Sequence, residues 1–342
     1  MKKRIIITVC AILVTVILLG FLQALVRPKY TDNREGALVG EYYSSTLDHD
    51  VIFVGDCEVY ETFVPAILWE EYGIKSYVRG SAQQLPWQSY YMLEDVFKHE
   101  KPKAVVFNVY SLKYGKPQSE EFNRMTLDGM KWSCAKWNAI KASMTEDENM
   151  LDYIFPILRY HSRITELDGD DFRYIFKETP NVSDRGYLMQ TGIVPMTVDQ
   201  RELVRGISDY TLPKTAMEYL DKMRELCREN GSELILVKAP TNSWRYWWYD
   251  EWNTQIEEYS EKNGLAYYNF IPECEDIGID WTTDTYDEGA HLNVYGAEKM
   301  TRYFGEILKN SHGFNGSGES AEWDGLVKAY HERKKQMEEQ NK

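Results

Sequence analysis

The amino-terminal segment places the strongest constraint on this chain. Ile5 to Val26 is a run of 22 residues without a charged side chain, with three basic residues before it and with Arg27 and Lys29 after it. At roughly 1.5 Å per residue, a helix of this length is about 33 Å long, which is enough to cross a bilayer. The basic excess before the span favours a cytoplasmic amino terminus and an extracytoplasmic remainder. We therefore expect residues 1–29 to form a single transmembrane anchor, with a cleaved signal peptide as the alternative.

The rest of the chain is strongly acidic. Five of the 39 Lys and Arg residues lie within the first 29, which leaves 34 against 54 Asp and Glu, a net charge of −20. A domain with this charge repels nucleic acid, so we expect no nucleic-acid partner. The five cysteines have no CxxC spacing, which argues against a zinc site, and their scattered positions do not require disulfides. The 14% aromatic content supports a sizeable core and a surface that faces sugars.

Short apolar runs alternate with helical patterns through most of residues 30–312. The expected strands are 51–54, 74–78, 104–110, 234–238 and 266–271, and the expected helices are 60–72, 87–98, 216–230, 249–263 and 293–309. This alternation predicts a parallel sheet of about five strands that is covered by helices on both faces. Residues 111–212 interrupt it with helical patterns at 131–144 and 150–167, so we expect a largely helical insertion after the third strand. Residues 313–342 lie outside this alternation. They begin with a flexible break, and the pattern at 323–341 predicts a charged helix with one apolar stripe.

Two distant segments carry the residue types of an acyl-transfer site. The apolar strand Val51 to Val54 stops at Gly55 and Asp56, and Cys57 follows. The carboxyl end of such a strand is where open α/β sheets place their chemistry. A thiol nucleophile needs a base, and that base needs an acid to orient it. His291 lies just before the last core helix with acidic residues directly ahead of it, so the sequence offers both partners; His161 is the rival base.

The extracytoplasmic part resembles the SGNH/GDSL hydrolases, especially the membrane-anchored Gram-positive branch similar to the teichoic-acid D-alanylation esterase. The resemblance rests on four blocks in sequence order: Gly-Asp-Cys-Glu at 55–58, Gly80 after the second strand, Asn108 at the end of the third, and Asp287 with His291. It implies a flavodoxin-like, three-layer fold without a cofactor. It also implies a membrane-bound O-acyltransferase as partner, and an envelope glycan or polymer as substrate.

The resemblance assigns one role to each matching residue. Cys57 stands at the position of the nucleophilic serine, His291 at that of the base and Asp287 at that of the acid. The backbone N–H groups of Cys57 and Gly80 and the side chain of Asn108 would form the oxyanion hole. The chain departs from the family pattern in three ways. Its nucleophile is a cysteine, its third block is Phe-Asn-Val, and the residue three before the histidine is not an aspartate.

That last departure leaves the orienting acid open. Glu288 occupies the position three before His291, Asp287 is four before it and Asp284 is seven before it. A metal site built from these three acids and His291 is a weaker alternative, and we expect no metal.

Two further clusters are candidates for substrate binding. Trp244, Arg245, Trp247 and Trp248 directly follow the fourth strand, where loops surround the expected site and aromatic faces could stack on sugar rings. Some of these rings are equally expected in the core. Arg159, His161 and Arg163 lie in the insertion, where they could grip an anion; the alternative is a helix end with solvated charges.

The sequence therefore predicts a membrane-anchored extracytoplasmic SGNH-like esterase or acyltransferase that works through a cysteine. The rival hypothesis is a catalytically inactive binding or scaffold protein of an envelope-modification system that keeps the fold.

Overall fold

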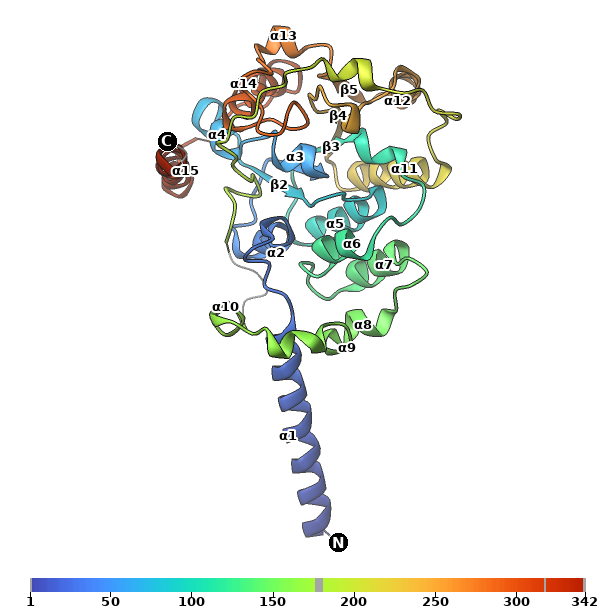
Figure 1. Ribbon diagram of the computed structural model, residues 1–342, viewed down its shortest axis with the longest axis vertical. Coiled ribbons are helices and arrows are strands. Elements are labelled where there is room, and N and C mark those ends of the chain that lie inside the picture. Colours follow the sequence, from blue (N-terminus) through green and yellow to red (C-terminus); the bar gives the residue numbers. More distant parts are fainter. Residues whose placement is uncertain (1, 176–180, 317, 341–342) are drawn as a thin grey trace.

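A five-stranded parallel sheet lies at the centre of the computed structural model, which describes residues 2–175, 181–316 and 318–340 (Figure 1). The strands are β1 (Val51–Gly55), β2 (Ser76–Gly80), β3 (Ala104–Asn108), β4 (Glu233–Lys238) and β5 (Ala266–Asn269). Their order is β2-β1-β3-β4-β5, and every neighbouring pair is parallel. The expected α/β class and strand count are confirmed. The order reverses between β1 and β3, and sheets of this kind bind ligands beyond the carboxyl ends of the strands at such a point.

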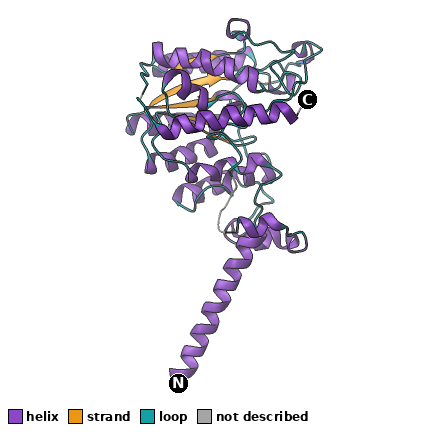
Figure 2. Cartoon of the chain, turned by 90° about the vertical axis from the view of Figure 1, so that its left-hand side faces the viewer, coloured by secondary structure: helices purple, strands orange, loops and turns teal. Residues whose placement is uncertain are grey.

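Helices cover both faces of the sheet because its strands are apolar on both faces (Figure 2). Successive side chains of a strand point to opposite faces. Val51 and Phe53 therefore pack toward α3 (Cys57–Tyr60), α4 (Pro65–Tyr72) and α14 (Val294–Ser311), whereas Ile52 and Val54 pack toward α5 (Pro86–His99), α11 (Lys214–Glu229) and α12 (Asp250–Asn263). The result is a three-layer α/β domain.

The insertion after β3 is helical in its first part only. The helices α6 (Glu120–Leu127), α7 (Cys134–Ser143) and α8 (Met150–Ile154) pack with the outer side of α5 in a separate apolar cluster. The expected helix 150–167 is wrong as one element. Pro156 starts a new helix, α9 (Pro156–Tyr160), because proline has no N–H for a continuous ladder. The chain continues through η4 (His161–Thr165) and α10 (Gly169–Arg173).

The described residues 181–213 correct the expectation of a helical insertion. Their one helical element is the short η5 (Gln200–Leu203). The remainder runs as an irregular strap that is held by backbone bonds to other parts of the domain. Leu188 N–H donates to Tyr60 O at 2.8 Å, and Val194 N–H donates to Thr285 O at 3.1 Å. This strap connects the turn after β1 with the loop that precedes α14.

The amino-terminal helix α1 (Lys2–Val26) projects from the domain as a single rod (Figure 1). Its first twenty described residues are solvent-exposed, and only Leu25 and Val26 are buried. An 18-residue window has a mean hydropathy of 3.1, so the helix is long and apolar enough to cross a membrane. This is consistent with single-pass anchoring.

The carboxyl-terminal helix α15 (Ala321–Gln340) packs against the domain. Trp323 and Tyr330 from its predicted apolar stripe are fully buried, and the Tyr330 hydroxyl donates to Glu298 of α14 at 2.8 Å. The remaining short elements are η1 (Arg34–Gly36), α2 (Leu38–Glu41), η2 (Tyr42–Ser44), η3 (Val109–Lys113), η6 (Trp244–Tyr246) and α13 (Cys274–Ile277). All five cysteines are free thiols.

Candidate active site

Cys57 is the first residue of α3, directly beyond the carboxyl end of β1. Gly55 is required for this turn, because a Cβ atom there would lie 2.4 Å from Val59 Cγ2 and 3.0 Å from Asn108 Cβ. Asp56 caps α3 by accepting the N–H of Glu58 at 3.3 Å. The Cys57 N–H belongs to the first turn, where amides have no acceptor within the helix. The local sequence thus places the thiol and its own N–H at the point where the strand order reverses.

His291 is held beside an acidic group by the loop that leads into α14. Asp287 accepts the backbone N–H of His291 at 2.8 Å through Oδ1, and its Oδ2 lies 2.6 Å from the ring Nδ1. Asn293 caps α14 by accepting the Tyr295 N–H and anchors the loop by donating to Thr283 O at 2.8 Å. The carboxylate therefore fixes both the backbone and the ring of His291, which leaves Nε2 as the nitrogen that faces away from Asp287.

The two distant segments meet in one buried cluster. Cys57 is 7% exposed and His291 is 8% exposed. The His291 ring lies edge-on to Tyr246, with 4.5 Å between the ring centroids, and the Tyr246 hydroxyl lies 3.7 Å from Cys57 Sγ. Nε2 of His291 is buried and has no hydrogen-bond partner among the residues that the structure describes. Cys57 and His291 nonetheless lie close enough to alter each other's pKa.

A second carboxylate, Glu61, faces the same imidazole. Its Oε2 lies 3.5 Å from His291 Nδ1, and its Oε1 accepts the Tyr286 hydroxyl at 2.7 Å. Burial raises the pKa of Glu61 to about 7. Glu61 and Tyr286 were not expected at the site from the sequence, and Tyr246 was expected only as part of the aromatic segment after the fourth strand. The sequence did contain a signal for Glu61. It follows Cys57 by four residues, and side chains four residues apart lie on the same side of a helix.

The pKa values of the thiol and the imidazole are set by burial and by the neighbouring charges. Burial raises the pKa of Cys57, and His291 offsets only part of that effect. Burial by itself would lower the pKa of His291, but Glu61, Cys57 and the hydrogen-bonded Asp287 raise it well above its usual value. The raised pKa of Cys57 favours a neutral thiol, and the neighbouring carboxylates favour the protonated form of the His291 imidazole.

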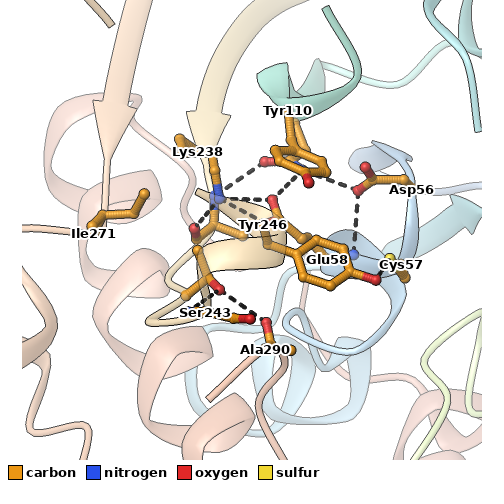
Figure 3. A network of polar contacts seen from close by, with 12 residues as sticks. Asp56, Cys57, Glu58, Tyr110, Lys238, Ser243, Tyr246, Ile271 and Ala290 are labelled. Carbon is orange, nitrogen blue, oxygen red and sulfur yellow. Dashed lines mark hydrogen bonds and ion pairs between the residues drawn. The ribbon is translucent and has the colours of Figure 1, made fainter. Parts of the chain in front are cut away.

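A buried ion pair lies beside the turn that carries Cys57 (Figure 3). Lys238 Nζ lies 2.7 and 2.9 Å from the two carboxylate oxygens of Glu58, and neither side chain is more than 1% exposed. Glu58 also accepts the Asn108 side-chain N–H at 2.8 Å. Glu58 is thus neutralised by Lys238, so its charge does not oppose a thiolate at Cys57.

The Asn108 amide has its hydrogen bonds inside this network. Its Nδ2 donates to Glu58 at 2.8 Å and to Asp56 at 3.2 Å, and its Oδ1 accepts the Ala239 N–H at 3.1 Å. In this arrangement Asn108 ties β3 and β4 to the turn that carries Cys57. An oxyanion would have to compete with two carboxylates for its N–H groups.

Gly80 lies at the carboxyl end of β2 and pairs with Gly55 across the sheet. A Cβ atom at Gly80 would lie 3.0 Å from Tyr60 Cδ1, 3.2 Å from Gly55 O and 3.3 Å from Asp56 O. The absence of a side chain lets the backbone of β2 approach the Cys57 turn closely. The role of the Gly80 N–H as an oxyanion donor stays a prediction.

The other acids near His291 have different partners. The Asp284 carboxylate lies 2.6 Å from Lys299 Nζ and accepts the Asp280 N–H at 2.9 Å. Glu288 has a positive φ of 60° and an exposed side chain. Asp287 is therefore the one of the three candidates that is hydrogen-bonded to the imidazole. Within residues 2–175, 181–316 and 318–340, no group of three or more His, Cys, Asp or Glu side chains has the arrangement of a metal site.

The two candidate substrate-binding clusters lie in different regions. Trp244 and Arg245 are exposed and Trp247 is half-buried, in the loop that also carries Tyr246 to the site, whereas Trp248 is a core residue. Arg159 pairs with Glu120 at 2.8 Å, Arg163 pairs with Asp171 at 3.0 Å, and the His161 ring lies 3.1 Å from Leu158 O. These three residues lie on α9 and η4 beside α1 rather than at Cys57 (Figure 1).

Comparison with known proteins gives no family: no family model matches the chain, and no curated protein sequence matches it.

Proposed function

We propose that this chain is a membrane-anchored, extracytoplasmic SGNH-like esterase or acyltransferase that acts on acyl esters of an envelope glycan or polymer. The proposal rests on one observation. Cys57 lies where the strand order of the parallel sheet reverses, and it shares a buried cluster with His291. The Nδ1 atom of His291 is bound to the Asp287 carboxylate at 2.6 Å. A nucleophile, a base and an orienting acid in this relation are the parts that acyl transfer requires.

The first half of the proposed reaction forms a thioester. The reaction proceeds from the neutral form of the imidazole: His291 Nε2 takes the Cys57 proton as the sulfur attacks the ester carbonyl, and a C–S bond forms. The carbonyl oxygen becomes an oxyanion that accepts hydrogen bonds from the N–H groups of Cys57 and Gly80. The C–O bond then breaks, and His291 returns its proton to the departing alcohol.

The second half releases the acyl group. Water or a glycan hydroxyl gives its proton to His291 and attacks the thioester carbonyl. The C–S bond breaks, and the sulfur recovers the proton from His291. Asp287 holds the imidazole orientation throughout, and its charge stabilises the imidazolium that forms in each half.

In this scheme Tyr246 serves as a further oxyanion donor. Its hydroxyl lies 3.7 Å from the sulfur, close enough to reach an oxygen that develops on a carbonyl bound to Sγ. Asn108 then acts as a positioning residue for the Cys57 turn rather than as a donor, because its amide is bonded to Glu58 and Asp56. By the resemblance, a membrane-bound O-acyltransferase supplies the acyl groups.

The proposal is tested by trapping the acyl group on the full-length protein in detergent. After incubation with p-nitrophenyl acetate, intact-protein and peptide mass spectrometry should show one acetyl group on Cys57 that hydroxylamine removes. Cys57→Ser should still be acylated, as an ester, and Cys57→Ala should not. His291→Ala should lower the acylation rate by about 10²–10⁴-fold, the range for general-base catalysis. His161→Ala is the matched control and should leave the rate unchanged.

The rival function is a binding or scaffold protein that has lost the chemistry. The burial that raises the pKa of Cys57 is the observation that favours it. This rival predicts no acetyl group on Cys57 under any condition that leaves the protein folded.

A further inference from the structure

Five large apolar side chains are exposed on the short helices next to the anchor. They are Leu151, Phe155, Leu158, Ile164 and Phe172, each between 45% and 56% exposed, and we call them the apolar rim. Three of them share one side of the chain, because Phe155 N–H bonds to Leu151 O at 2.8 Å and Leu158 N–H bonds to Phe155 O at 2.9 Å. These bonds keep the i,i+4 and i,i+3 spacing across the break at Pro156.

The apolar rim is fixed at the carboxyl-terminal end of α1. The elements α9, η4 and α10 all contact α1, and Arg163 Nη1 donates to the Val26 carbonyl at 2.7 Å. Figure 1 and Figure 2 show these short helices as a layer beneath the domain, at the end from which α1 projects. The rim residues therefore lie where the anchor leaves the domain.

The length of the anchor sets the position of a bilayer relative to this layer. About 20 helical residues cross a hydrocarbon core. A core that starts at Ile5, after the charged Lys2 to Arg4, would end near Ala24. The first twenty described residues of α1 are exposed, and the last of the helix is buried against the domain. The edge of the hydrocarbon core therefore falls at the part of α1 that contacts α9, η4 and α10.

We propose that the apolar rim inserts into the outer leaflet of the same bilayer that α1 crosses. The occupant of the rim is the lipid acyl region, because α9, η4 and α10 contact α1 and the exposed apolar part of α1 ends a few residues before its buried Leu25 and Val26. Charge has little part in this contact. Arg159 and Arg163 are paired with Glu120 and Asp171, and residues 150–173 hold five acidic residues against three basic ones. The domain would thus be seated on the membrane rather than tethered above it.

The proposal is tested by the depth of spin labels in the full-length protein in phosphatidylcholine nanodiscs. Single cysteines replace Leu158 and Phe172 in a background without the native cysteines, and Val198 provides the matched control. Val198 is also an exposed apolar residue, and it lies in the strap near η5, which Figure 1 shows at the end of the domain away from α1. Electron paramagnetic resonance then compares collision with oxygen, which concentrates in lipid, and with a water-soluble nickel chelate.

Insertion predicts that labels at 158 and 172 collide with oxygen several-fold more, relative to the nickel chelate, than the label at 198. Replacing a third of the lipid with phosphatidylglycerol should not change this ratio. Equal ratios at the three positions would overturn the proposal. Labels at 158 and 172 that are immobilised and shielded from both reagents would also overturn it, because a protein and not lipid would then cover the rim.

Discussion

Removal of Lys238 should destabilise the domain sharply, because it would leave the Glu58 carboxylate buried without a cation. Both side chains are at most 1% exposed, and the two Nζ–O distances are 2.7 and 2.9 Å. Loss of one partner of such a pair costs about 3–5 kcal/mol. At roughly 2 °C per kcal/mol for a domain of this size, Lys238→Met should lower the melting temperature by about 6–10 °C.

The double variant Lys238→Met with Glu58→Gln separates the buried charge from simple loss of packing. The substituted glutamine would be neutral and would still accept the Asn108 N–H. We expect the double variant to be more stable than Lys238→Met alone, with a coupling free energy of about 2 kcal/mol or more. Thermal unfolding of the full-length protein, followed by circular dichroism in one detergent, measures the differences. Lys328→Met, at a lysine side chain that is 79% exposed, is the control and should change stability by less than about 0.5 kcal/mol.

Two results would refute this reasoning. The first is a Lys238→Met variant within about 1 kcal/mol of the parent protein. The second is a double variant whose loss equals the sum of the two single losses. Either result would mean that removal of Lys238 does not leave a buried, unpaired charge on Glu58.

Three further perturbations test other parts of the account. Asp287→Asn should lower the pKa of His291 toward its usual value, because the carboxylate that favours the imidazolium is lost; NMR titration of labelled histidines measures the shift, and an unchanged pKa would contradict the role of Asp287. Burial raises the pKa of Glu41 from 4.5 to about 7. Protonation of Glu41 therefore stabilises the folded state fully below pH 4.5, and this contribution to stability is lost as the pH rises through 7. The parent protein should therefore lose up to about 3 kcal/mol more stability between pH 5 and pH 8 than Glu41→Gln, and equal losses would refute this assignment. Gly80→Ala should lower the free energy of unfolding by about 1–3 kcal/mol, because its Cβ would crowd Asp56 O at 3.3 Å; urea unfolding measures it, and a neutral effect would show that the turn has spare room.

Much of the fold could be predicted from the sequence because its signals are local. The β-branched run Val51 to Val54 and the helical spacing of 216–230 lie close to the observed β1 and α11. The second strand was expected at 74–78 and lies at Ser76–Gly80, because its register is set by pairing with β1 and not by its own composition. The break at Pro156 was available from the sequence, since proline cannot continue a helical ladder.

The candidate site was only partly predictable because it depends on contacts between distant segments. The pairing of Asp287 with His291 is a local relation, which the spacing of four residues allowed but did not select over Asp284 or Glu288. The contact of Tyr246 with Cys57 and His291 joins three loops that only the sheet brings together. The cation that neutralises Glu58 comes from Lys238 at the end of another strand, and no pattern in the sequence pairs these two residues.

The central claim is that His291 controls the reactivity of Cys57, and alkylation of the folded protein tests it directly. Cys227 provides an internal reference, because it is a buried thiol whose pKa burial raises to about 12. Peptide mass spectrometry after iodoacetamide treatment at pH 8 should show Cys57 reacting faster than Cys227. His291→Ala should slow Cys57 by at least about tenfold, which corresponds to one pKa unit, and should leave Cys227 unchanged. A Cys57 that reacts as slowly as Cys227, at a rate that His291→Ala does not alter, would contradict the account.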